Sequence, residues 1–303
     1  MAESSFIQFI QDDIKKYEGN RGFVKASLLE RILVKKQPPD RLHPNPEDEF
    51  SIRGIGPNMS IVNNYEKTIR TCLRFQEPIF AEPIYVEKML PEGYMILNGH
   101  HRWAAAVRMN IKTVRVKVVN VTHEEEIYRM LKASDGRKRV ILDLDDVVFA
   151  AEGEAYEPLF FPYSEVYQCR MKLGMAAFLA GLKEMGYDIW AFTESIHSAK
   201  YFDEFFRAHN LQLTGIVNCM DGKRVARMKK NKKLEKAFSY QYKQSLTLLK
   251  DSAVFIDAET KSYEMLDMDF SGATGNLLEQ IAAIEDRYAA VKKEQEDQYD
   301  SEY

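Results

Sequence analysis

The stretch "RVILDLDDVVF", residues 139–149, decides how the second half of the chain is interpreted. Its apolar run, residues 140–142, has the composition of a buried strand. Three carboxylates, Asp143, Asp145 and Asp146, follow within four residues. Carboxylates crowded together repel one another and lose hydration on burial, so they either cap the next element or form part of a site. Taken alone, carboxylates that directly follow a strand are more typical of residues that cap the next element than of a site.

The sequence around this stretch alternates between strands and helices. We predict strands at 188–193, 214–219 and 253–258, and helices at 175–186 and 199–210. Apolar strands alternating with helices indicate an α/β domain with a parallel sheet covered on both faces. In such sheets ligands bind beyond the carboxyl ends of the strands. Thr193 and Glu194 end one predicted strand and Asp257 and Glu259 another, so these groups are expected to converge on Asp143.

The first part of the chain has the pattern of a compact α+β domain. It ends near residue 121, and a charged helix with a polar hinge leads to a predicted boundary near residue 134. A last helix ends in the acidic tail "EQEDQYDSEY". The predicted domains are 1–134, 135–270 and 271–303. Within the first, the expected elements are helices at 5–17, 61–75 and 100–109, and strands near 34, at 82–89, at 94–99 and at 113–121.

Composition excludes several classes of protein. The chain has 303 residues, with 42 basic and 46 acidic side chains and a net charge of −4, so no global field attracts nucleic acid. Cys72, Cys169 and Cys219 are scattered, which argues against a disulfide framework or a structural zinc site. No apolar run approaches the length of a membrane span, and no signal peptide is apparent. These features predict a cytoplasmic protein without a membrane partner.

The carboxylates suit phosphoryl chemistry. A carboxylate can attack phosphorus to form an aspartyl-phosphate, and a second carboxyl two residues on can act as acid and base. Two carboxylates and a phosphate require a cation, and hard oxygen ligands specify Mg²⁺. A hydroxyl at a neighbouring strand end and a lysine would complete such a site.

Three motifs resemble those of haloacid dehalogenase-like phosphatases: "DLDDV", "IWAFTES" and "AVFIDAE", across residues 138–262. The resemblance implies a Rossmannoid domain with Asp143 as nucleophile, Asp145 as acid/base and Thr193 on the phosphate. Mg²⁺ would be held by Asp143, Asp145 and Asp257. The last motif departs from the family, because Asp257 is followed by Ala258 instead of a second nearby acid. The family lysine is assigned to Lys236 by its distance before the last strand; its rivals are Lys223, Lys232, Lys233 and Lys243.

The segment between the first two motifs, residues 152–174, is too short for a large cap domain. An open pocket favours a bulky or macromolecular phosphorylated substrate, such as a nucleotide or a nucleic acid. The segment is also aromatic, and two interpretations remain: stacking on a base, or packing of a β-hairpin flap. The aromatic residues are Tyr156, Phe160, Phe161, Tyr163 and Tyr167.

A second motif, "NGHHRW", joins a predicted strand to a helix. A helix N-terminus attracts phosphate, arginine pairs with phosphate oxygens, and histidines add donors. The stretch resembles the nucleotide-binding signature of the ParB/sulfiredoxin-like fold, over about residues 30–121. The resemblance implies that Gly99, His100, His101 and Arg102 hold the phosphates of ATP or CTP, in a kinase, a nucleotide switch or a scaffold. No cysteine adjoins the motif, which argues against sulfiredoxin chemistry.

These observations lead to one main hypothesis. It is an Mg²⁺-dependent phosphomonoester hydrolase joined to a ParB/sulfiredoxin-like nucleotide-binding domain. The alternatives are a non-catalytic regulatory protein that binds nucleotide or phosphate, and a ParB-like nuclease or DNA-associated protein. Residues 223–236 hold eight basic residues and one acid, which predicts either a track for a phosphate backbone or a solvated helix. The sequence leaves the substrate and the oligomeric state open.

Overall fold

The structure, a computed structural model, describes residues 3–17, 22–238, 246, 252–268 and 274–301. The chain divides into two compact units, Met1–Val121 and Thr122–Tyr303. No helix in the described ranges is both long enough and apolar enough to cross a membrane.

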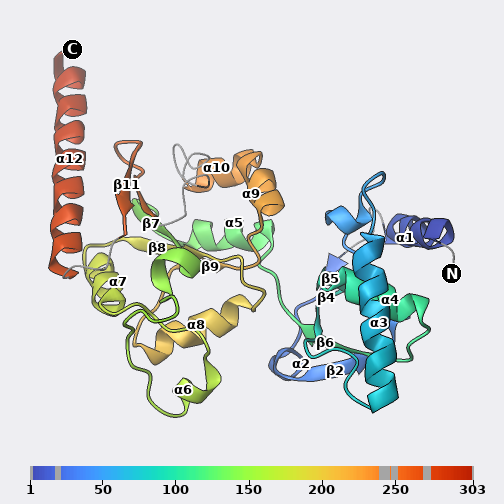
Figure 1. The fold of residues 1–303 in the computed structure, drawn as a ribbon. Helices are drawn as coiled ribbons and strands as arrows, with labels where there is room; N and C mark the ends of the chain where they lie inside the picture. The colour runs from blue at the N-terminus through green and yellow to red at the C-terminus, as the bar shows by residue number, and fades with distance from the viewer. Residues whose placement is uncertain (1–2, 18–21, 239–245, 247–251, 269–273, 302–303) are drawn as a thin grey trace. The chain divides into compact units, whose positions relative to one another are not determined.

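The first unit is built on a mixed sheet with the order β2-β6-β4-β5-β3, and β1 pairs with β4 (Figure 1). The β4 and β5 strands are antiparallel, whereas β6 runs parallel to β4. The inward side chains Ile84, Val86 and Ile96 are fully buried. The strands are β1 Gly22–Phe23, β2 Val34–Gln37, β3 Leu42–His43, β4 Ile84–Leu90, β5 Tyr94–Asn98 and β6 Val114–Val118.

Three helices, α1, α3 and α4, pack apolar side chains against this sheet, at the positions that the sequence periodicity predicts, whereas α2 has no buried residue. Phe6, Val62 and Trp103 belong to one buried core with the strands. Arg108 pairs with the largely buried Glu66 at 2.9 Å and so joins α4 to α3. The helices are α1 Glu3–Tyr17, α2 Leu28–Ile32, α3 Met59–Phe75 and α4 His100–Arg108, with short 3-10 turns at Pro39–Arg41 and Glu49–Ser51.

The second unit has a five-stranded sheet with the order β11-β10-β7-β8-β9. The first three strands along the chain are parallel, with Asp143 opposite Phe192. However, β10 runs antiparallel to β7, with Asp257 opposite Lys138, so the prediction of an entirely parallel sheet is wrong at this strand. The strands are β7 Lys138–Asp143, β8 Asp188–Phe192, β9 Gly215–Val217, β10 Ser252–Asp257 and β11 Ser262–Asp267.

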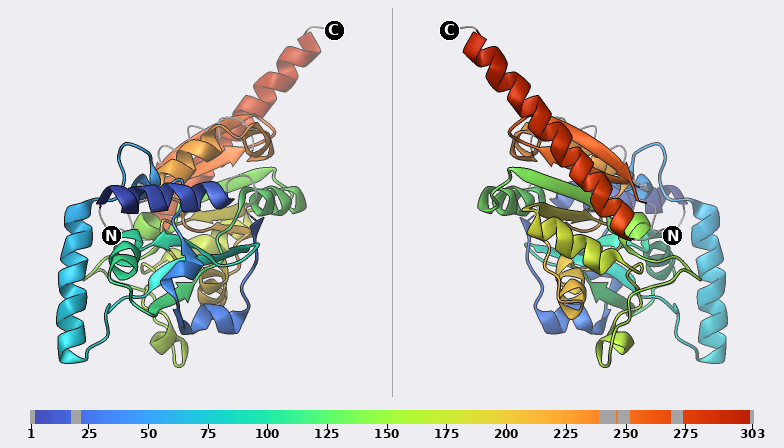
Figure 2. Two further views of the ribbon diagram at one scale, coloured as in Figure 1. Left: turned by 90° about the vertical axis from the view of Figure 1, so that its right-hand side faces the viewer. Right: turned by 90° about the vertical axis from the view of Figure 1, so that its left-hand side faces the viewer.

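Helices cover both faces of this sheet, as predicted (Figures 1 and 2). The core on one face includes Phe178, Phe205 and Ile281 from α7, α8 and α12. The core on the other face includes Ile127 from α5 together with Met228 and Leu234 from α9 and α10. The helices are α5 Glu124–Ala133, α6 Tyr163–Val166, α7 Met175–Glu184, α8 Ala199–Ala208, α9 Gly222–Lys229, α10 Lys232–Phe238 and α12 Thr274–Ser301.

The boundary between the units lies at residues 121 and 122, earlier than the one predicted near residue 134. The reason is α5, whose buried Ile127 and Leu131 pack in the second unit. Ile281 of α12 is also buried in that unit, and Glu285 of the same helix accepts a hydrogen bond from Tyr187. The predicted division at residues 270 and 271 lies outside the described residues.

Candidate functional site

The N-terminus of α4 is shaped by one glycine. The β5 strand ends at Asn98, Gly99 adopts a left-handed conformation with φ +100°, and α4 begins at His100. Non-glycine residues are strained in this conformation. A Cβ at residue 99 would also lie 3.0 Å from Nη2 of Arg102. A glycine is therefore required where the strand turns into the helix.

Both histidines that open α4 are held by the loop between β3 and α3. Nε2 of His100 accepts the backbone N–H of Asn45 at 3.2 Å, and Nε2 of His101 accepts that of Asn58 at 3.2 Å. A nitrogen that accepts carries no proton, so in each neutral ring the proton lies on Nδ1. Burial lowers the pKa of His101, which favours its neutral form. Phe50 packs against both rings.

Arg102 is turned back into the protein. Its Nη1 donates to the backbone carbonyl of Glu82 at 2.9 Å, and its Nη2 donates to Oδ1 of Asn98 at 3.0 Å. Only 6% of the residue is exposed. The predicted pairing of Arg102 with phosphate is therefore not prepared in this structure, where the side chain instead ties the end of β5 to the segment before β4.

Asp143 lies at the carboxyl end of β7 and caps the following π-helical turn, Leu144–Val148. Its Oδ1 accepts the backbone N–H of Asp145 at 2.7 Å and that of Asp146 at 3.4 Å. Burial raises the pKa of Asp143 to about 6, and the charges of Asp145 and Asp146 add to that increase, whereas the two N–H groups oppose it. The same carboxylate thus caps the turn and has a raised pKa because it is largely buried.

Asp145 and Thr193 meet because β7 and β8 are parallel neighbours. Oγ1 of the buried Thr193 lies 2.9 Å from both carboxylate oxygens of Asp145. The backbone N–H of Glu194 donates to Oδ2 of Asp145 at 2.8 Å. The structure therefore brings Asp143, Asp145 and Thr193 together at the carboxyl edge of the sheet.

Asp257 does not join this group. Because β10 is antiparallel to β7, Asp257 lies opposite Lys138 at the other edge of the sheet. Its Oδ1 accepts the backbone N–H groups of Glu259 at 2.8 Å and Thr260 at 3.4 Å, which shapes the turn between β10 and β11. The prediction that Asp257 shares a metal with Asp143 and Asp145 is contradicted by this geometry.

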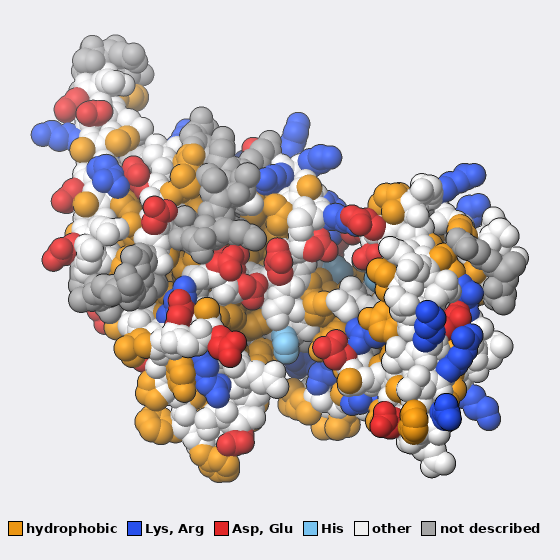
Figure 3. All heavy atoms as spheres, viewed as in Figure 1, with side chains coloured by type: hydrophobic (Ala, Val, Ile, Leu, Met, Phe, Trp, Pro, Cys, Tyr) orange, Lys and Arg blue, Asp and Glu red, His pale blue; other side chains and the backbone are white. Residues whose placement is uncertain are grey.

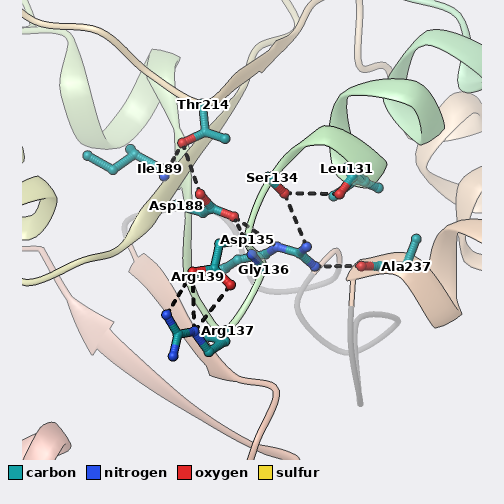
Figure 4. Close-up of polar contacts among 10 residues, drawn as sticks. All are labelled: Leu131, Ser134, Asp135, Gly136, Arg137, Arg139, Asp188, Ile189, Thr214 and Ala237. Carbon is teal, nitrogen blue, oxygen red and sulfur yellow. Dashed lines mark hydrogen bonds and ion pairs between the residues drawn. The ribbon is translucent and has the colours of Figure 1, made fainter.

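Lys236 also belongs to the opposite edge. It is exposed on α10, and the carbonyl of the next residue, Ala237, accepts a hydrogen bond from Arg139 near the amino end of β7 (Figure 4). The Arg139 guanidinium lies 3.6 Å from Asp188 and near Ser134, at the start of the strands. The structure thus does not bring Lys236 to Asp143. Its rival Lys243 lies outside the described residues.

Other cations adjoin the carboxyl edge instead. Nζ of Lys172 donates to the backbone carbonyl of Asp146 at 2.8 Å. The loop before α9 bonds to the end of β8, with the N–H of Met220 donating to the carbonyl of Thr193 at 2.9 Å. Lys223 lies in the first turn of α9, three residues after Met220. Lys223 was among the lysines considered from sequence, whereas nothing in the spacing marks Lys172.

The loop after β8 contributes a further pair that sequence reasoning missed. Oγ of Ser195 lies 2.9 Å from Nδ1 of His197, and the N–H of Ser195 donates to Oγ1 of Thr193 at 3.0 Å. The His197 ring stacks on Tyr201, with centroids 4.6 Å apart. The polar residues that follow β8 are a sequence signal for this pair, but only Thr193 and Glu194 of that run were predicted to lie in the site.

The donor set does not fit Mg²⁺ well. Both oxygens of Asp145 are already bound by Thr193 and Glu194, and Asp257 is at the opposite edge. Among the residues that the structure describes, no group of three His, Cys, Asp or Glu side chains could hold a metal ion. The described residues therefore do not form the Mg²⁺ site that the sequence predicts.

The segment between β7 and α7, for which a β-hairpin flap was one of two interpretations, contains isolated bridges and no continuous strand. Antiparallel bridges join Phe149 to Met171 and Tyr156 to Lys172. Tyr167 is buried against the core, as flap packing predicts. Phe160 and Phe161 at the tip are 79% and 82% exposed and remain able to contact another molecule.

Comparisons with known proteins identify part of the chain. Residues 59–134 match the ParB N-terminal domain, so the chain contains a ParB-like domain that includes α3, β4, β5, α4 and β6 and continues into α5. No curated protein matches the chain. This family match lies outside residues 138–262 and so gives no support to the haloacid dehalogenase-like assignment.

Two solved structures of the chromosome-partitioning protein ParB from Caulobacter crescentus, both C-terminally truncated, are similar to part of the chain. The one complexed with CTP-gamma-S is 26% identical and covers 31% of this chain, with a TM-score of 0.24. The one complexed to the centromeric parS site is 21% identical and covers 33%, with a TM-score of 0.22. The chain spans about half the length of each, 48% and 49%. TM-scores this low do not establish a common overall fold.

Proposed function

We propose that the first unit binds a nucleotide at the N-terminus of α4. The observation that carries the proposal is the ParB N-terminal domain match, because residues 59–134 include β5, Gly99 and α4. The local geometry supports it. The left-handed Gly99 turns the chain directly into the first turn of the helix, and that turn favours negative charge.

The histidines add to the same site. With Nε2 of His101 occupied by the backbone N–H of Asn58, the Nδ1–H of this neutral ring is the donor that it can offer to a phosphate oxygen, whereas Nδ1 of the buried His100 lies 3.8 Å from Oδ2 of Asp48. Arg102 supports the turn instead of the ligand, because its donors are bound to Glu82 and Asn98. None of these contacts selects a base, so ATP and CTP are both candidates.

Titration calorimetry with ATP, CTP, GTP and UTP tests the proposal on the full chain. We expect saturable binding of at least one triphosphate, weakened tenfold or more in His101→Gln. Glutamine can still accept the N–H of Asn58 through its side-chain oxygen, so the loop should be retained while the imidazole is lost. The matched control is His209→Gln, at a half-buried histidine in the second unit. Absence of binding by all four nucleotides would reject the proposal.

A second candidate function is phosphomonoester hydrolysis at the carboxyl edge of the second unit. The observation that favours it is the contact between Asp145 and Thr193 beside Asp143. An ionised Asp143 could attack phosphorus and form an aspartyl-phosphate as the P–O bond to the leaving group breaks, with the leaving oxygen departing as a phenolate or taking a proton from solvent. Asp145, which accepts hydrogen bonds from Thr193 and Glu194, is held as a base that could deprotonate the water attacking the aspartyl-phosphate. Lys172 and Lys223 would balance the phosphate charge.

Hydrolysis of p-nitrophenyl phosphate tests this candidate, because its leaving group needs no acid. Asp143→Asn should abolish turnover, and Asp146→Asn, at an exposed neighbour, should retain it. Below about pH 6 the rate should fall as Asp143 becomes protonated. The reaction is run with and without Mg²⁺. If the wild type shows no turnover in either condition, the second unit is not a phosphatase, and a non-catalytic role in binding is favoured.

A further inference from the structure

A strongly basic segment lies on the second unit, and Lys223 is the one residue of it that also belongs to a proposed site. Residues 223–236 contain eight lysines and arginines and one acid, Glu235. These residues form α9 and α10, and blue side chains gather over the two helices in Figure 3. We define the basic ridge as four exposed lysines here: Lys230, Lys232, Lys233 and Lys236.

Some of the basic residues in this segment have structural partners. Arg224 is buried and donates to the carbonyls of Asn218 and Thr122. Arg227 pairs with Glu124 at 3.1 Å. In contrast, the lysines of the basic ridge form no ion pair with any residue in the described ranges. Like charges this close repel one another, so a ligand of opposite charge would stabilise the ridge.

The opposite side of α9 and α10 packs against the core of the second unit. Met228, Leu234 and Phe238 are buried in the core that covers the sheet. Neither α9 nor α10 exposes a large apolar side chain in the described structure. Binding of an amphipathic helix to a membrane adds an apolar face that enters the lipid to the attraction of its basic residues, and the ridge offers no such face. Its recognition chemistry is therefore that of charge alone.

The ridge also has a defined direction. The loop before α9 is bonded to Thr193 at the carboxyl edge of the sheet, whereas the end of α10 is bonded to Arg139 near the amino edge. The seven residues of α10 alone extend about 10 Å, the length over which one DNA strand carries about three phosphates. A row of lysines on this scale matches a polymer of phosphates better than a single anion.

We propose that the basic ridge binds the phosphate backbone of a nucleic acid, independently of sequence. The local charge offsets the net charge of −4 of the whole chain, which would otherwise repel such a polymer. The proposal does not depend on nucleotide binding by the first unit or on hydrolysis by the second.

Fluorescence anisotropy of labelled 20-nucleotide single strands and duplexes, measured with the full chain over a series of salt concentrations, tests the proposal. Each lysine that neutralises a phosphate contributes about 0.7 to 0.9 to the slope of log K against log salt. The variant with Lys230, Lys232, Lys233 and Lys236 all changed to Gln should therefore bind about tenfold or more weakly at low salt, with a slope reduced by about 3.

The matched control makes the same change of charge elsewhere, at Lys67, Lys112, Lys183 and Lys293, which are also exposed. It should bind as the wild type does. The proposal fails if the wild type does not bind either oligonucleotide at low salt, or if the ridge variant binds with unchanged affinity and slope. It also fails if anionic phosphatidylserine vesicles bind the ridge while oligonucleotides do not.

Discussion

At the scale of a single residue, Asp143 combines a structural and a chemical property. Its folded-state pKa is about 6, raised above the ordinary value of 3.8 mainly by burial. The folded state therefore holds the proton more tightly, and the stability of the second unit should fall as pH rises from about 4 to 6. We expect Asp143→Asn to raise the free energy of unfolding at pH 8 by about 1 to 3 kcal/mol and to change it little at pH 4.5.

Urea denaturation at the two pH values, followed by the fluorescence of Trp190, measures this effect. The Trp103→Phe background leaves Trp190, which is buried in the second unit, as the remaining tryptophan. Asp146→Asn, at an exposed carboxylate, serves as the control and should change stability by less than about 0.5 kcal/mol. A destabilised Asp143→Asn at pH 8 would show that the cap matters more than the buried charge.

Gly99 gives a second prediction at this scale. Gly99→Ala places a Cβ at a left-handed φ of +100° and 3.0 Å from the Arg102 guanidinium. Gly54→Ala has a similar φ of +94° but no neighbour within 4 Å, so it isolates the backbone strain. We expect about 1 to 2 kcal/mol of destabilisation for Gly54→Ala. Gly99→Ala should cost about 1 kcal/mol more, because the bond of Arg102 to Asn98 must shift.

Thermal unfolding with and without the preferred nucleotide measures both effects of Gly99→Ala. The nucleotide should raise the melting temperature of the wild type and of Gly54→Ala, but not that of Gly99→Ala. Equal destabilisation by the two alanines, with the nucleotide effect kept in both, would show that the close contact with Arg102 has no role in binding.

At the scale of the elements, the direction of β10 separates the two halves of the predicted phosphatase site. Asp257 shapes the turn between β10 and β11 through Oδ1, which accepts two backbone N–H groups. Asp257→Ala should therefore lower the free energy of unfolding by about 1 to 2 kcal/mol, whereas Asp257→Asn, which retains an oxygen acceptor, should be close to the wild type. Urea denaturation of the two variants provides the comparison.

The same variants test the location of Asp257. If it lies at the far edge of the sheet, Asp257→Asn should leave any p-nitrophenyl phosphate hydrolysis and its pH dependence unchanged. A loss of activity as large as that in Asp143→Asn, without a loss of stability, would place Asp257 beside Asp143 and contradict the antiparallel register.

The sequence predicted the neighbouring positions of Asp143, Asp145 and Thr193 because parallel strands place their carboxyl ends at one edge, and the strand and helix pattern between them was clear. It could not predict the direction of β10. The run "AVFI" is apolar throughout, and a strand buried on both faces has the same pattern in either direction. The error in β10 moved Asp257 to the wrong edge, and the assignment of Lys236 rested on its distance before that strand.

The candidate site in the first unit shows a different limit. The sequence correctly located Gly99 and the start of α4, since both follow from local backbone chemistry. It could not show that Arg102 turns back to Glu82 and Asn98, or that Asn45 and Asn58 fix the two histidines. These contacts join segments far apart in the chain, and periodicity carries no information about them.

At the scale of the whole molecule, α5 determines where the two units separate. Ile127 and Leu131 are buried in the second unit, and Arg224 of that unit donates to the carbonyl of Thr122. The fragment 1–121 should therefore be about as stable as the fragment 1–134, although the ParB N-terminal domain match extends to residue 134. Thermal unfolding followed by circular dichroism compares the two fragments.

The complementary fragments give the opposite expectation. Deleting α5 from the second unit removes the buried side chains of Ile127 and Leu131 and exposes the core that they cover. Burial of each aliphatic side chain contributes about 1.5 to 3 kcal/mol to the free energy of unfolding. The fragment 135–303 should therefore be at least about 3 kcal/mol less stable than the fragment 122–303, or fail to fold. If 135–303 instead matches 122–303 while 1–121 is much less stable than 1–134, then α5 belongs to the first unit, because the same two side chains cannot complete both cores.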